Sequence, residues 1–242
     1  MTPRIHWPWA APGLNRLSEE ASHHLIRVLR LQVGASVCLF NGRGEEGIGT
    51  IQVADARACE LELPSLVPVP RESPVRSIVL QSLCLGDKMD WVVQKASELG
   101  AAEVWPIWAA RSQLQLSGDR AAKRVTHWQK VAEAAAAQCG RNEIPQVLPI
   151  TSLAAALEAF QAAPAGRAGW LLDPFAQETV GTSPLPSEVW IAIGPEAGWT
   201  DCEERAARDA GFRGLRMGPR ILRTETVAPA ILSVLAARTG EF

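Results

Sequence analysis

Apolar residues in the larger, C-terminal part of the chain form short continuous runs that alternate with stretches of helical periodicity. Patterns typical of helices occupy residues 89–99, 119–138 and 152–163, and the apolar runs around them read SIVLQSL, EVWPIW, PQVLPI, GWLLD and VWIAIG. Strands that are apolar on both faces and alternate with helices are typical of a mostly parallel sheet that helices cover on both sides. This part of the chain is therefore predicted to have an α/β fold.

Residues 1–66 follow a different pattern, with one amphipathic helix and several short strands. A helix is predicted within the segment 18–34, where Leu25, Val28 and Leu29 share one face and Gly34 stands just past the end of the helix. The strand-like runs that follow read SVCLF, IGTIQVA and ACELELPSLV. The stretch PVPRESPV then has the prolines and charges of a stiff, exposed linker. We therefore expect two domains, at residues 1–68 and 74–242.

The composition is that of an ordinary soluble globular protein, which excludes several other classes. Of the 242 residues, 47% are hydrophobic and 21% are charged. No apolar run reaches the roughly 18 residues of a membrane span, and the N-terminus lacks the pattern of a signal peptide. The five cysteines are scattered and form no CxxC pair, which argues against a disulfide scaffold or a zinc site. We expect no membrane segment, no metal and a cytoplasmic location.

The segment GRGEEG matches the dinucleotide-binding pattern GxGxxG through Gly42, Gly44 and Gly47. That pattern binds a pyrophosphate only where a helix begins directly after the glycines, because backbone N–H groups at the helix N-terminus hold the anion. Here the strand-like run IGTIQVA follows instead. The segment is therefore predicted to be a hairpin turn between two strands and not a nucleotide site.

The segment IAIGPEAGWTDCEERAARDAG has a better geometry for binding a ligand. An apolar strand ends at Ile193, a short Gly-Pro-Glu-Ala-Gly loop follows, and Thr200 and Glu203 have the spacing of a helix capping box. In open α/β sheets, ligands bind outside the carboxyl ends of the strands. A plain tight turn needs only one glycine, so the two glycines and Glu196, which we place on the buried side, favour a binding loop.

The segment LRMGPRILRTETVAPAIL repeats this arrangement and mixes arginines with apolar residues. The strand GLRM ends at a second Gly-Pro corner, and a helix is predicted to follow the loop with Pro229 in its first turn, where a missing N–H costs nothing. We expect the two Gly-Pro loops to form two walls of one pocket. Ile221 and Leu222 would then cover an apolar ligand surface, while Arg220 and Arg223 face a polyanion.

Charge is distributed unevenly along the chain, although the net charge is only −2. Residues 205–238 contain seven arginines against two acidic residues, and a locally basic surface can supply phosphate contacts. An arginine-rich protein also uses arginine simply on solvated faces, and from charge alone we prefer that interpretation. The nine tryptophans have the chemistry to stack on bases, but Trp105, Trp170 and Trp190 lie within apolar runs and are predicted to be core.

Six segments of the chain, taken in order, resemble the ribosomal RNA small-subunit methyltransferase E family: SHHLIRVLRLQVG, FNGRGEEG, MDWVVQKASELG, EAAAAQCGRNEIPQV, IGPEAGWTDCEE and MGPRILRTET. The resemblance covers essentially the whole chain, and the last two segments are highly specific. It implies a small PUA-like β-barrel RNA-binding domain followed by a SPOUT-type α/β domain with a deep trefoil knot, acting as a homodimer. The knot is implied by the resemblance alone, because knots are otherwise essentially absent from protein folds.

The resemblance also implies the reaction and its site. The expected activity is S-adenosylmethionine-dependent methylation of N3 of a uridine, expected to be uridine 1498, in 16S rRNA of the small ribosomal subunit. The cofactor is expected to contact three loops that follow strand ends, at Leu172, Ile193, Gly194, Pro195, Glu196, Gly198, Met217, Gly218, Ile221, Leu222 and Arg223. Because phosphate contacts position an RNA substrate, RNA contacts are expected from Arg27, Arg30, Arg111, Arg141 and Arg220.

The chemistry of the reaction indicates which groups a catalyst must offer. Uridine N3 loses its imino proton before or during methyl transfer, and negative charge develops on O2 and O4 of the base. A base, or a cation that stabilises the anion, is therefore needed beside the methyl donor. We expect Arg223 to stabilise the anion or a phosphate, and Glu225 or Glu196 to act as the base or to position a hydrogen bond. No metal is required.

Two positions depart from the pattern of the family. Ala197 replaces the first glycine of the usual Gly-Pro-Glu-Gly-Gly loop, which would strain the loop by roughly 1 kcal/mol or more if φ were positive. Pro229 stands where a helix former is usual. Neither change removes a functional group. Two alternatives stay open: a SPOUT methyltransferase that acts on another RNA, such as a transfer RNA, and an RNA-binding or ribosome-assembly factor without catalysis.

Overall fold

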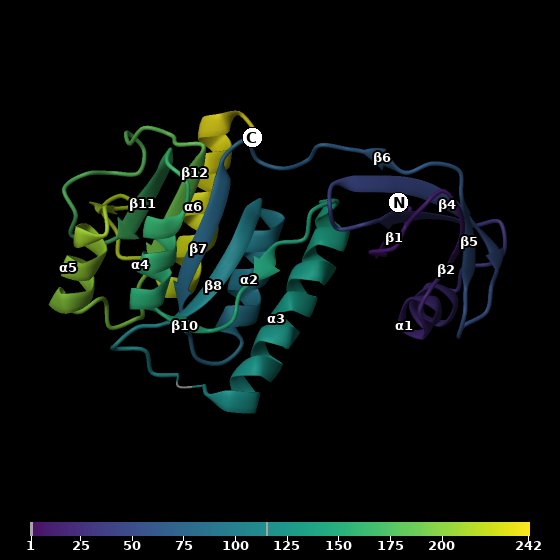
Figure 1. Ribbon diagram of the computed structural model, residues 1–242, viewed down its shortest axis with the longest axis horizontal. Coiled ribbons are helices and arrows are strands. Elements are labelled where there is room, and N and C mark those ends of the chain that lie inside the picture. Colours follow the sequence, from purple (N-terminus) through teal and green to yellow (C-terminus); the bar gives the residue numbers. More distant parts are fainter. Residues whose placement is uncertain (1, 115) are drawn as a thin grey trace. The chain divides into compact units, whose positions relative to one another are not determined.

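The computed structural model of the protein describes residues 2–114 and 116–242. Contacts divide the chain into two compact units, of which the first comprises Met1–Glu72 with Ala136–Ile144 and the second Ser73–Ala135 with Pro145–Phe242. Figure 1 shows both units and labels elements of each. No helix in the described part of the chain is long and apolar enough to cross a membrane.

The first unit is built on a six-stranded sheet. Along the order β1-β3-β4-β5-β2, the pair β1 and β3 is parallel and the other neighbours are antiparallel, and β6 pairs with β4. Buried side chains such as Leu39, Ile51 and Leu61 form a core of their own on this sheet. The strands are β1 (Arg4–His6), β2 (Gly13–Arg16), β3 (Ser36–Phe40), β4 (Glu45–Val53), β5 (Glu60–Leu63) and β6 (Val67–Pro68).

The helical segment of the first unit is shorter than the sequence predicts. The helix α1 (Glu19–His23) continues into a π-helical turn, η1 (His24–Val28), and ends there. It does not extend to residue 34 because Arg30 adopts a left-handed φ of 55°, which no α-helix accommodates. Leu25 is fully buried but Val28 is 57% exposed. The predicted apolar face is therefore only partly buried.

The start of GRGEEG forms the predicted hairpin turn between the antiparallel strands β3 and β4, and its last three residues begin β4. The side-chain oxygen of the buried Asn41 accepts hydrogen bonds from the backbone N–H groups of Arg43, at 2.8 Å, and Glu45, at 3.2 Å. Gly42 and Gly44 supply the positive φ angles that the turn requires. With these N–H groups bonded and no helix following, the segment has none of the features of a nucleotide site.

Residues 136–144, which the sequence assigned to the second domain, pack with the first unit. Arg141 is buried, and its Nε donates a hydrogen bond to Glu72 at 2.9 Å. The side-chain oxygen of Asn142 accepts a hydrogen bond from Arg4 at 2.6 Å. These contacts join residues that lie far apart along the chain, so no local pattern predicts them.

Glu46 belongs to the same network and makes it sensitive to pH. It pairs with Arg4 at 2.5 Å and with Arg71 at 2.6 Å. Burial raises the pKa of Glu46, but hydrogen bonds and charges from Arg71 and Arg4 outweigh burial and lower it to about 2. A carboxyl group whose pKa is lower in the folded state than in the unfolded state stabilises the fold when the pH is above the unfolded-state pKa. This stabilisation is lost as the pH falls through the folded-state pKa.

The variant Glu46→Gln is therefore expected to have a free energy of unfolding roughly 3 kcal/mol lower than wild type at pH 7. The difference should shrink as the pH falls from about 4.5 towards 2, as measured by urea denaturation at a series of pH values. Glu62→Gln, which replaces an exposed carboxylate on β5, is the control. A difference that does not change with pH would show that the charge of Glu46 is not the source of the stability.

The second unit is an α/β domain, as predicted, on a seven-stranded sheet whose described pairings are all parallel. The strand order is β10-β8-β7-β12-β11-β13, with β9 beside β8. The strands are β7 (Arg76–Ser82), β8 (Ala101–Trp108), β9 (Gln146–Val147), β10 (Thr151–Ser152), β11 (Arg167–Leu172), β12 (Glu188–Ile193) and β13 (Phe212–Leu215). The helices are α2 (Lys88–Glu98), α3 (Gly118–Cys139), α4 (Leu153–Ala162), α5 (Asp201–Asp209) and α6 (Thr224–Thr239).

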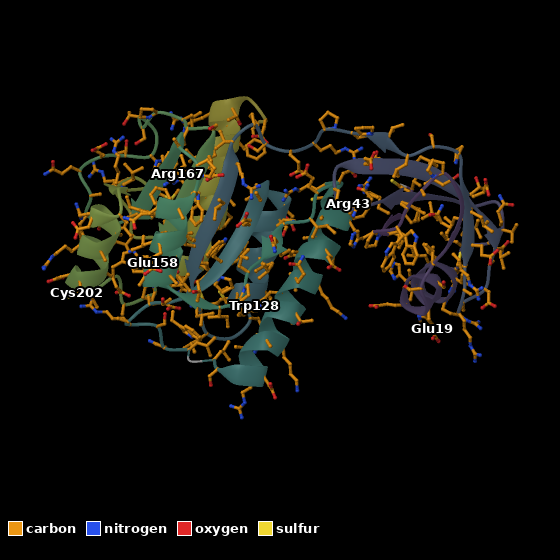
Figure 2. All side chains as sticks on the ribbon, in the orientation of Figure 1. Glu19, Arg43, Trp128, Glu158, Arg167 and Cys202 are labelled. Carbon is orange, nitrogen blue, oxygen red and sulfur yellow. The ribbon has the colours of Figure 1, made fainter. Side chains whose placement is uncertain are left out.

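Two apolar clusters form the core of the second unit. One joins the sheet to side chains of α2, α3 and α6, and the other joins it to α4 and α5. Trp128, labelled on α3 in Figure 2, is 1% exposed, and its Nε1 donates a hydrogen bond to Asp90 of α2 at 3.0 Å. Trp170 and Trp190 are buried, which confirms their prediction as core, and Trp105 is partly buried against the second cluster.

Two details of the second unit differ from the prediction. The run PQVLPI contributes only the two residues of β9 to the sheet. Pro229 lies in the second turn of α6 and not in the first, because the helix already begins at Thr224. A proline there leaves the carbonyl of Glu225 without its helical N–H partner. The helix continues because Ala228 and Ile231, on either side of the proline, are fully buried in the core.

Candidate functional site

A cavity of about 450 Å³ lies where β11 and β12 end and α6 begins. Parallel strands bring the loops that follow them to one edge of the sheet, which is where open α/β sheets bind ligands. Nine of the eleven residues predicted to contact a cofactor line this cavity: Leu172, Ile193, Gly194, Pro195, Glu196, Gly198, Ile221, Leu222 and Arg223. The structure thus brings together the loops that the sequence indicated as walls of one pocket, and binding of a cofactor there stays a prediction.

The other two residues, Met217 and Gly218, belong to the turn that leads into the cavity. Met217 lines a smaller hollow of about 60 Å³, which shares Leu172, Ile221 and Leu222 with the main cavity. Gly218 has a φ of 82° and forms the corner after β13. A residue with a side chain rarely adopts that angle, so the glycine is required by the path of the chain.

Short-range contacts hold the loop that follows β12. Gly198 has a φ of 73°, and its N–H bonds to the carbonyl of Pro195 at 2.9 Å, which closes the turn. Thr200 and Glu203 form the predicted capping box at the start of α5. Ala197 does not adopt a positive φ. The strain that a positive φ would impose on this alanine therefore does not arise.

The indole of Trp199 packs against Gly194 and leaves little room there for a side chain. The indole is 7% exposed, and a Cβ added at Gly194 would lie 3.1 Å from two of its atoms. Gly194→Ala is therefore expected to displace the indole and to lower the free energy of unfolding by about 1–3 kcal/mol. The matched control is Gly181→Ala, where an added Cβ meets nothing within 4 Å. Equal stabilities of the two variants in urea denaturation would contradict this account of the loop.

Thr224, the first residue of α6, joins two walls of the cavity. Its hydroxyl donates a hydrogen bond to the carbonyl of Gly194 at 2.7 Å and accepts one from Nε2 of Gln81 at 3.1 Å. Gln81 lies on β7 and is fully buried. Neither residue is among those predicted from the sequence. A polar glutamine inside the apolar run SIVLQSL is the signal that could have indicated Gln81.

Lys88, at the start of α2, links the two candidate carboxylates and was also missed. Its Nζ lies 3.0 Å from an oxygen of Glu196 and 3.4 Å from an oxygen of Glu225. The hydrogen bond and the charge of Glu196, and then the carboxylate of Glu225, raise the pKa of Lys88. The ammonium group therefore stays charged between the two carboxylates.

The two carboxylates differ in their access to the cavity. Glu196 lines it but is an exposed residue, which corrects our prediction of a buried-side position. The reason is that its charged group points to Lys88 and water instead of the core. The side chain of Glu225 is only 16% exposed and stands on the other side of Lys88. Of the two, Glu196 is therefore the better placed to reach a ligand.

Arg111 reaches the cavity from the loop after β8. Its guanidinium donates hydrogen bonds to the carbonyls of Ala197, at 3.1 Å, and Trp199, at 3.0 Å. In the same loop, the backbone N–H of Ala110 donates to Glu203 of α5 at 2.7 Å. The arginine that the sequence indicated as an RNA contact therefore also braces the wall of the cavity.

Arg223 precedes α6 directly and contributes a cation to the cavity. It is exposed, lines the cavity, and has no ion pair within the part of the chain that the structure describes. Three other arginines of residues 205–238 are engaged within the unit: Arg208 and Arg213 in ion pairs, and Arg238 with backbone carbonyls. The basic composition of this stretch is thus partly structural, and Arg223 is the arginine in it that faces the cavity.

The remaining residues predicted to contact RNA differ in exposure. Arg27, Arg30 and Arg220 are exposed. Arg141 is only 6% exposed, and its guanidinium bonds to Glu72. As placed, Arg141 stabilises the first unit and is not available to a phosphate. No local pattern around Arg141 predicts this contact, because Glu72 lies far away along the chain.

Other kinds of chemistry find little support near the cavity. Burial, and then the charge of Glu196, raises the pKa of the Cys84 thiol to about 12. A thiol that stays protonated at neutral pH is a poor nucleophile. Within the described residues, histidine, cysteine and carboxylate side chains form no group of three or more that could hold a metal ion.

The chain is similar to known RNA methyltransferases in sequence and in structure. Residues 71–236 match the RNA methyltransferase domain family, and residues 17–63 match the RNA methyltransferase PUA domain. The ribosomal RNA small subunit methyltransferase E of Bacillus subtilis is 32% identical, over 95% of this chain and 91% of its own length.

Two solved structures resemble the whole chain. A putative methyltransferase from Legionella pneumophila, in complex with the bound cofactor S-adenosylmethionine, is 35% identical with a TM-score of 0.90. A ribosomal RNA small subunit methyltransferase E from Neisseria gonorrhoeae, bound to S-adenosylmethionine, is 31% identical with a TM-score of 0.89. In each case 98% of both chains is covered.

Proposed function

Because the chain belongs to the ribosomal RNA small subunit methyltransferase E family, we propose that it uses S-adenosylmethionine to methylate RNA of the small ribosomal subunit. The target in this proposal is N3 of a uridine in 16S rRNA, at position 1498. The enzyme would act in the cytoplasm, where ribosomal RNA is made and assembled in bacteria. The first unit, which includes the match to the PUA domain, would bind RNA, and the second would carry out the reaction.

The cavity at the ends of β11 and β12 is the observation that carries this proposal. Its volume of about 450 Å³ falls within the roughly 300–1,000 Å³ typical of cofactor sites. The apolar side chains of Leu172, Ile193 and Leu222 suit an adenine ring. The backbone of the Gly-Pro-Glu-Ala-Gly loop offers hydrogen bonds, and the carboxylates of Asp173 and Glu196 suit the positive charges of this cofactor. The residues present therefore fit S-adenosylmethionine.

The bound cofactor supplies an electrophilic methyl group on a sulfonium. The protein must hold the uridine so that N3 faces that group, because alignment of two reactants can lower the activation free energy by several kcal/mol. It must also accept the N3 proton and stabilise the charge that develops on O2 and O4. Arg223, a cation at the cavity without an ion pair among the described residues, suits the stabilisation of that charge.

Glu196 suits the removal of the N3 proton, because it lines the cavity and a carboxylate can accept that proton. Lys88 holds Glu196 in place and, with Glu225, completes a row of alternating charges. Glu225 would then act behind Glu196 by fixing the position of Lys88. The exposed Arg220, beside Met217 in the smaller hollow, would contact a phosphate, as would Arg27 and Arg30 of the first unit.

We further propose that the second unit contains a trefoil knot and functions as a homodimer. The knot is proposed from the membership of the family, and in this structure the contact of Thr224 with the carbonyl of Gly194 lays the segment after β13 against the loop after β12. Ile221 and Phe175, which line the cavity yet are 73% and 83% exposed, support the dimer. A partner subunit would cover such exposed apolar side chains.

The non-catalytic alternative rested on Ala197, which occupies its loop without strain. Transfer of a labelled methyl group tests the proposal against both alternatives. The purified protein is incubated with S-adenosylmethionine labelled in its methyl group and with 16S rRNA, small subunits or transfer RNA from a strain that lacks the protein. We expect label in small-subunit RNA, and calorimetry should detect binding of S-adenosylmethionine but not of NAD. Label in transfer RNA alone would overturn the substrate, and cofactor binding without transfer to any RNA would favour an assembly factor.

A further inference from the structure

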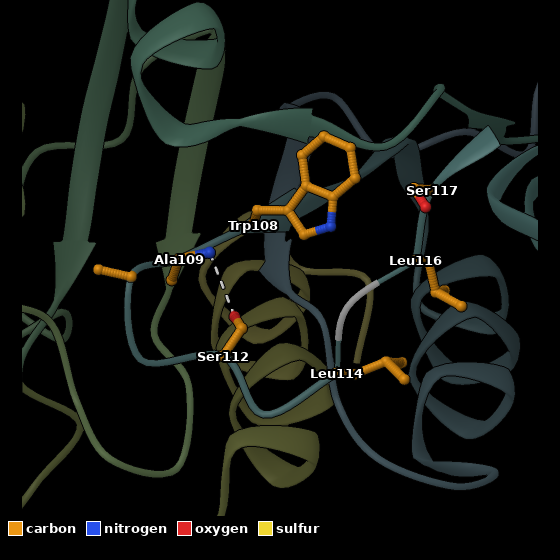
Figure 3. A pocket seen from close by; sticks show the side chains of 7 residues that line it. Trp108, Ala109, Ser112, Leu114, Leu116 and Ser117 are labelled. Carbon is orange, nitrogen blue, oxygen red and sulfur yellow. Dashed lines mark hydrogen bonds between the residues drawn. The ribbon is translucent and has the colours of Figure 1, made fainter.

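A second pocket, of about 430 Å³, is lined by the end of β8 and by described residues between β8 and α3 in the second unit. Because all described strands of this sheet are parallel, the pocket lies at the same edge of the sheet as the cofactor cavity. The indole of Trp108, the last residue of β8, forms one side and is 37% exposed. Figure 3 shows the side chains around the hollow: Trp108, Ser112, Leu114, Leu116 and Ser117.

We propose that this pocket binds one nucleobase of the substrate RNA, next to the uridine that is methylated, by stacking the base on the indole of Trp108. The inference rests on the proposed RNA methylation and extends it to the recognition of the substrate. Indole faces stack on any base, and Leu114 and Leu116 give the pocket a second apolar side. The indole of Trp108 is accessible to such a base, since it is exposed at the rim of the pocket.

Polar groups in the pocket suit the edge of a base. The hydroxyl oxygen of Ser112 accepts a hydrogen bond from the backbone N–H of Ala109 at 3.1 Å. This bond fixes the loop and leaves the O–H of Ser112 free to donate to a carbonyl of a base. Ser117 adds a second hydroxyl. Apolar faces with a few hydroxyl groups are what an unstacked nucleobase requires.

The same loop connects the pocket to the cofactor cavity. Ala110 lines the pocket, and the next residue, Arg111, lines the cavity and bonds to the carbonyls of Ala197 and Trp199. No described residue lines both hollows. A base held against Trp108 is therefore not the base that is methylated but one of its neighbours along the strand.

Charge around the pocket favours RNA over other ligands with an apolar surface. The helix α3 begins at Gly118, directly after Ser117, and its first two turns present Arg120, Lys123 and Arg124 to solvent. None of these three side chains forms an ion pair within the described residues. Asp119 is the acidic residue in the same two turns of α3. Unpaired cations beside an aromatic pocket suit the phosphates on either side of a stacked base.

Substitution of Trp108 tests the proposal by RNA binding, which needs no methyl transfer. Trp108→Ala is expected to raise the dissociation constant for a short RNA that spans the target uridine by about 5- to 150-fold, the equivalent of the ~1–3 kcal/mol of one base–aromatic stack. Trp108→Phe should keep most of the affinity. Trp91→Ala removes a tryptophan of similar exposure, 41%, from α2 and should bind RNA like wild type. All variants should bind S-adenosylmethionine like wild type.

An RNA with one abasic nucleotide beside the target uridine identifies the partner of Trp108. On one side of the uridine, the abasic RNA should bind wild type as weakly as the intact RNA binds Trp108→Ala, and the two losses should not add. Normal RNA binding by Trp108→Ala would overturn the proposal, as would equal losses in Trp108→Phe or additive losses on both sides of the uridine. If wild type transfers no methyl group while Trp108→Ala still weakens RNA binding, the proposed reaction is wrong and the base pocket stands.

Discussion

The variant Arg223→Ala is expected to transfer methyl groups about 10²–10³-fold more slowly than wild type, with nearly unchanged affinity for S-adenosylmethionine. Arg223 lines the cavity, and within the described residues no carboxylate neutralises it. Its charge is therefore available to a ligand. In the proposed reaction, negative charge on uridine O2 and O4 grows only as the N3 proton leaves, so the interaction is strongest in the transition state and its loss should lower kcat.

The controls for this prediction separate chemistry from folding and from general electrostatics. Arg216→Ala removes an exposed arginine of the same segment that lines neither the cofactor cavity nor the smaller hollow beside it. This variant should react at close to the wild-type rate. Arg223→Lys retains the charge without the planar guanidinium and should recover part of the rate. Equal losses of rate and of cofactor affinity in Arg223→Ala would assign this residue to cofactor binding and not to the reaction.

The variant Glu196→Gln is expected to lower the rate of the chemical step by about 10²–10⁴-fold, the contribution typical of a positioned general base. Glu196 lines the cavity, and its partner Lys88 holds it at 3.0 Å. Glutamine keeps the shape of the side chain, and its amide oxygen can still accept a hydrogen bond from Lys88, but it cannot accept the proton that the proposed reaction removes from N3. The loss should therefore appear in single-turnover rates with RNA and cofactor both saturating.

Glu225→Gln is the matched comparison, because it removes the other carboxylate that contacts Lys88. We expect a smaller loss from it, since Glu225 is largely buried behind Lys88 and acts on the reaction through that lysine. A larger loss in Glu225→Gln than in Glu196→Gln would reverse the two roles. Equal and small losses in both would show that neither carboxylate takes the proton, and that Arg223 and alignment of the reactants provide the catalysis.

Features that depend on short segments of sequence could be predicted. The parallel sheet follows from apolar runs such as VWIAIG, because a strand buried on both faces has no polar alternation. The capping box of Thr200 and Glu203 and the hairpin of GRGEEG depend on neighbours within a few residues. The loops around the cavity follow from the positions of the Gly-Pro corners after strand ends, together with the topology of parallel sheets.

Features that depend on contacts between distant segments could not be predicted. Lys88 contacts Glu196 and Glu225 only because α2, the loop after β12 and α6 meet in space. Arg141 likewise donates a hydrogen bond to Glu72, which lies far from it along the chain. The tryptophan pattern was equally incomplete: Trp108 ends an apolar run like the core tryptophans, yet its side chain is exposed at the rim of a pocket.

The most direct test of the central claim is reverse transcription of 16S rRNA from a strain that lacks this protein. A methyl group on N3 blocks the Watson–Crick edge of uridine and stops the polymerase. Wild-type rRNA should therefore give a stop beside the target uridine, the deletion strain should lose that stop, and a plasmid copy of the wild-type chain should restore it where Arg223→Ala does not. An unchanged stop in the deletion strain would contradict the assignment of this protein as the methyltransferase of that uridine.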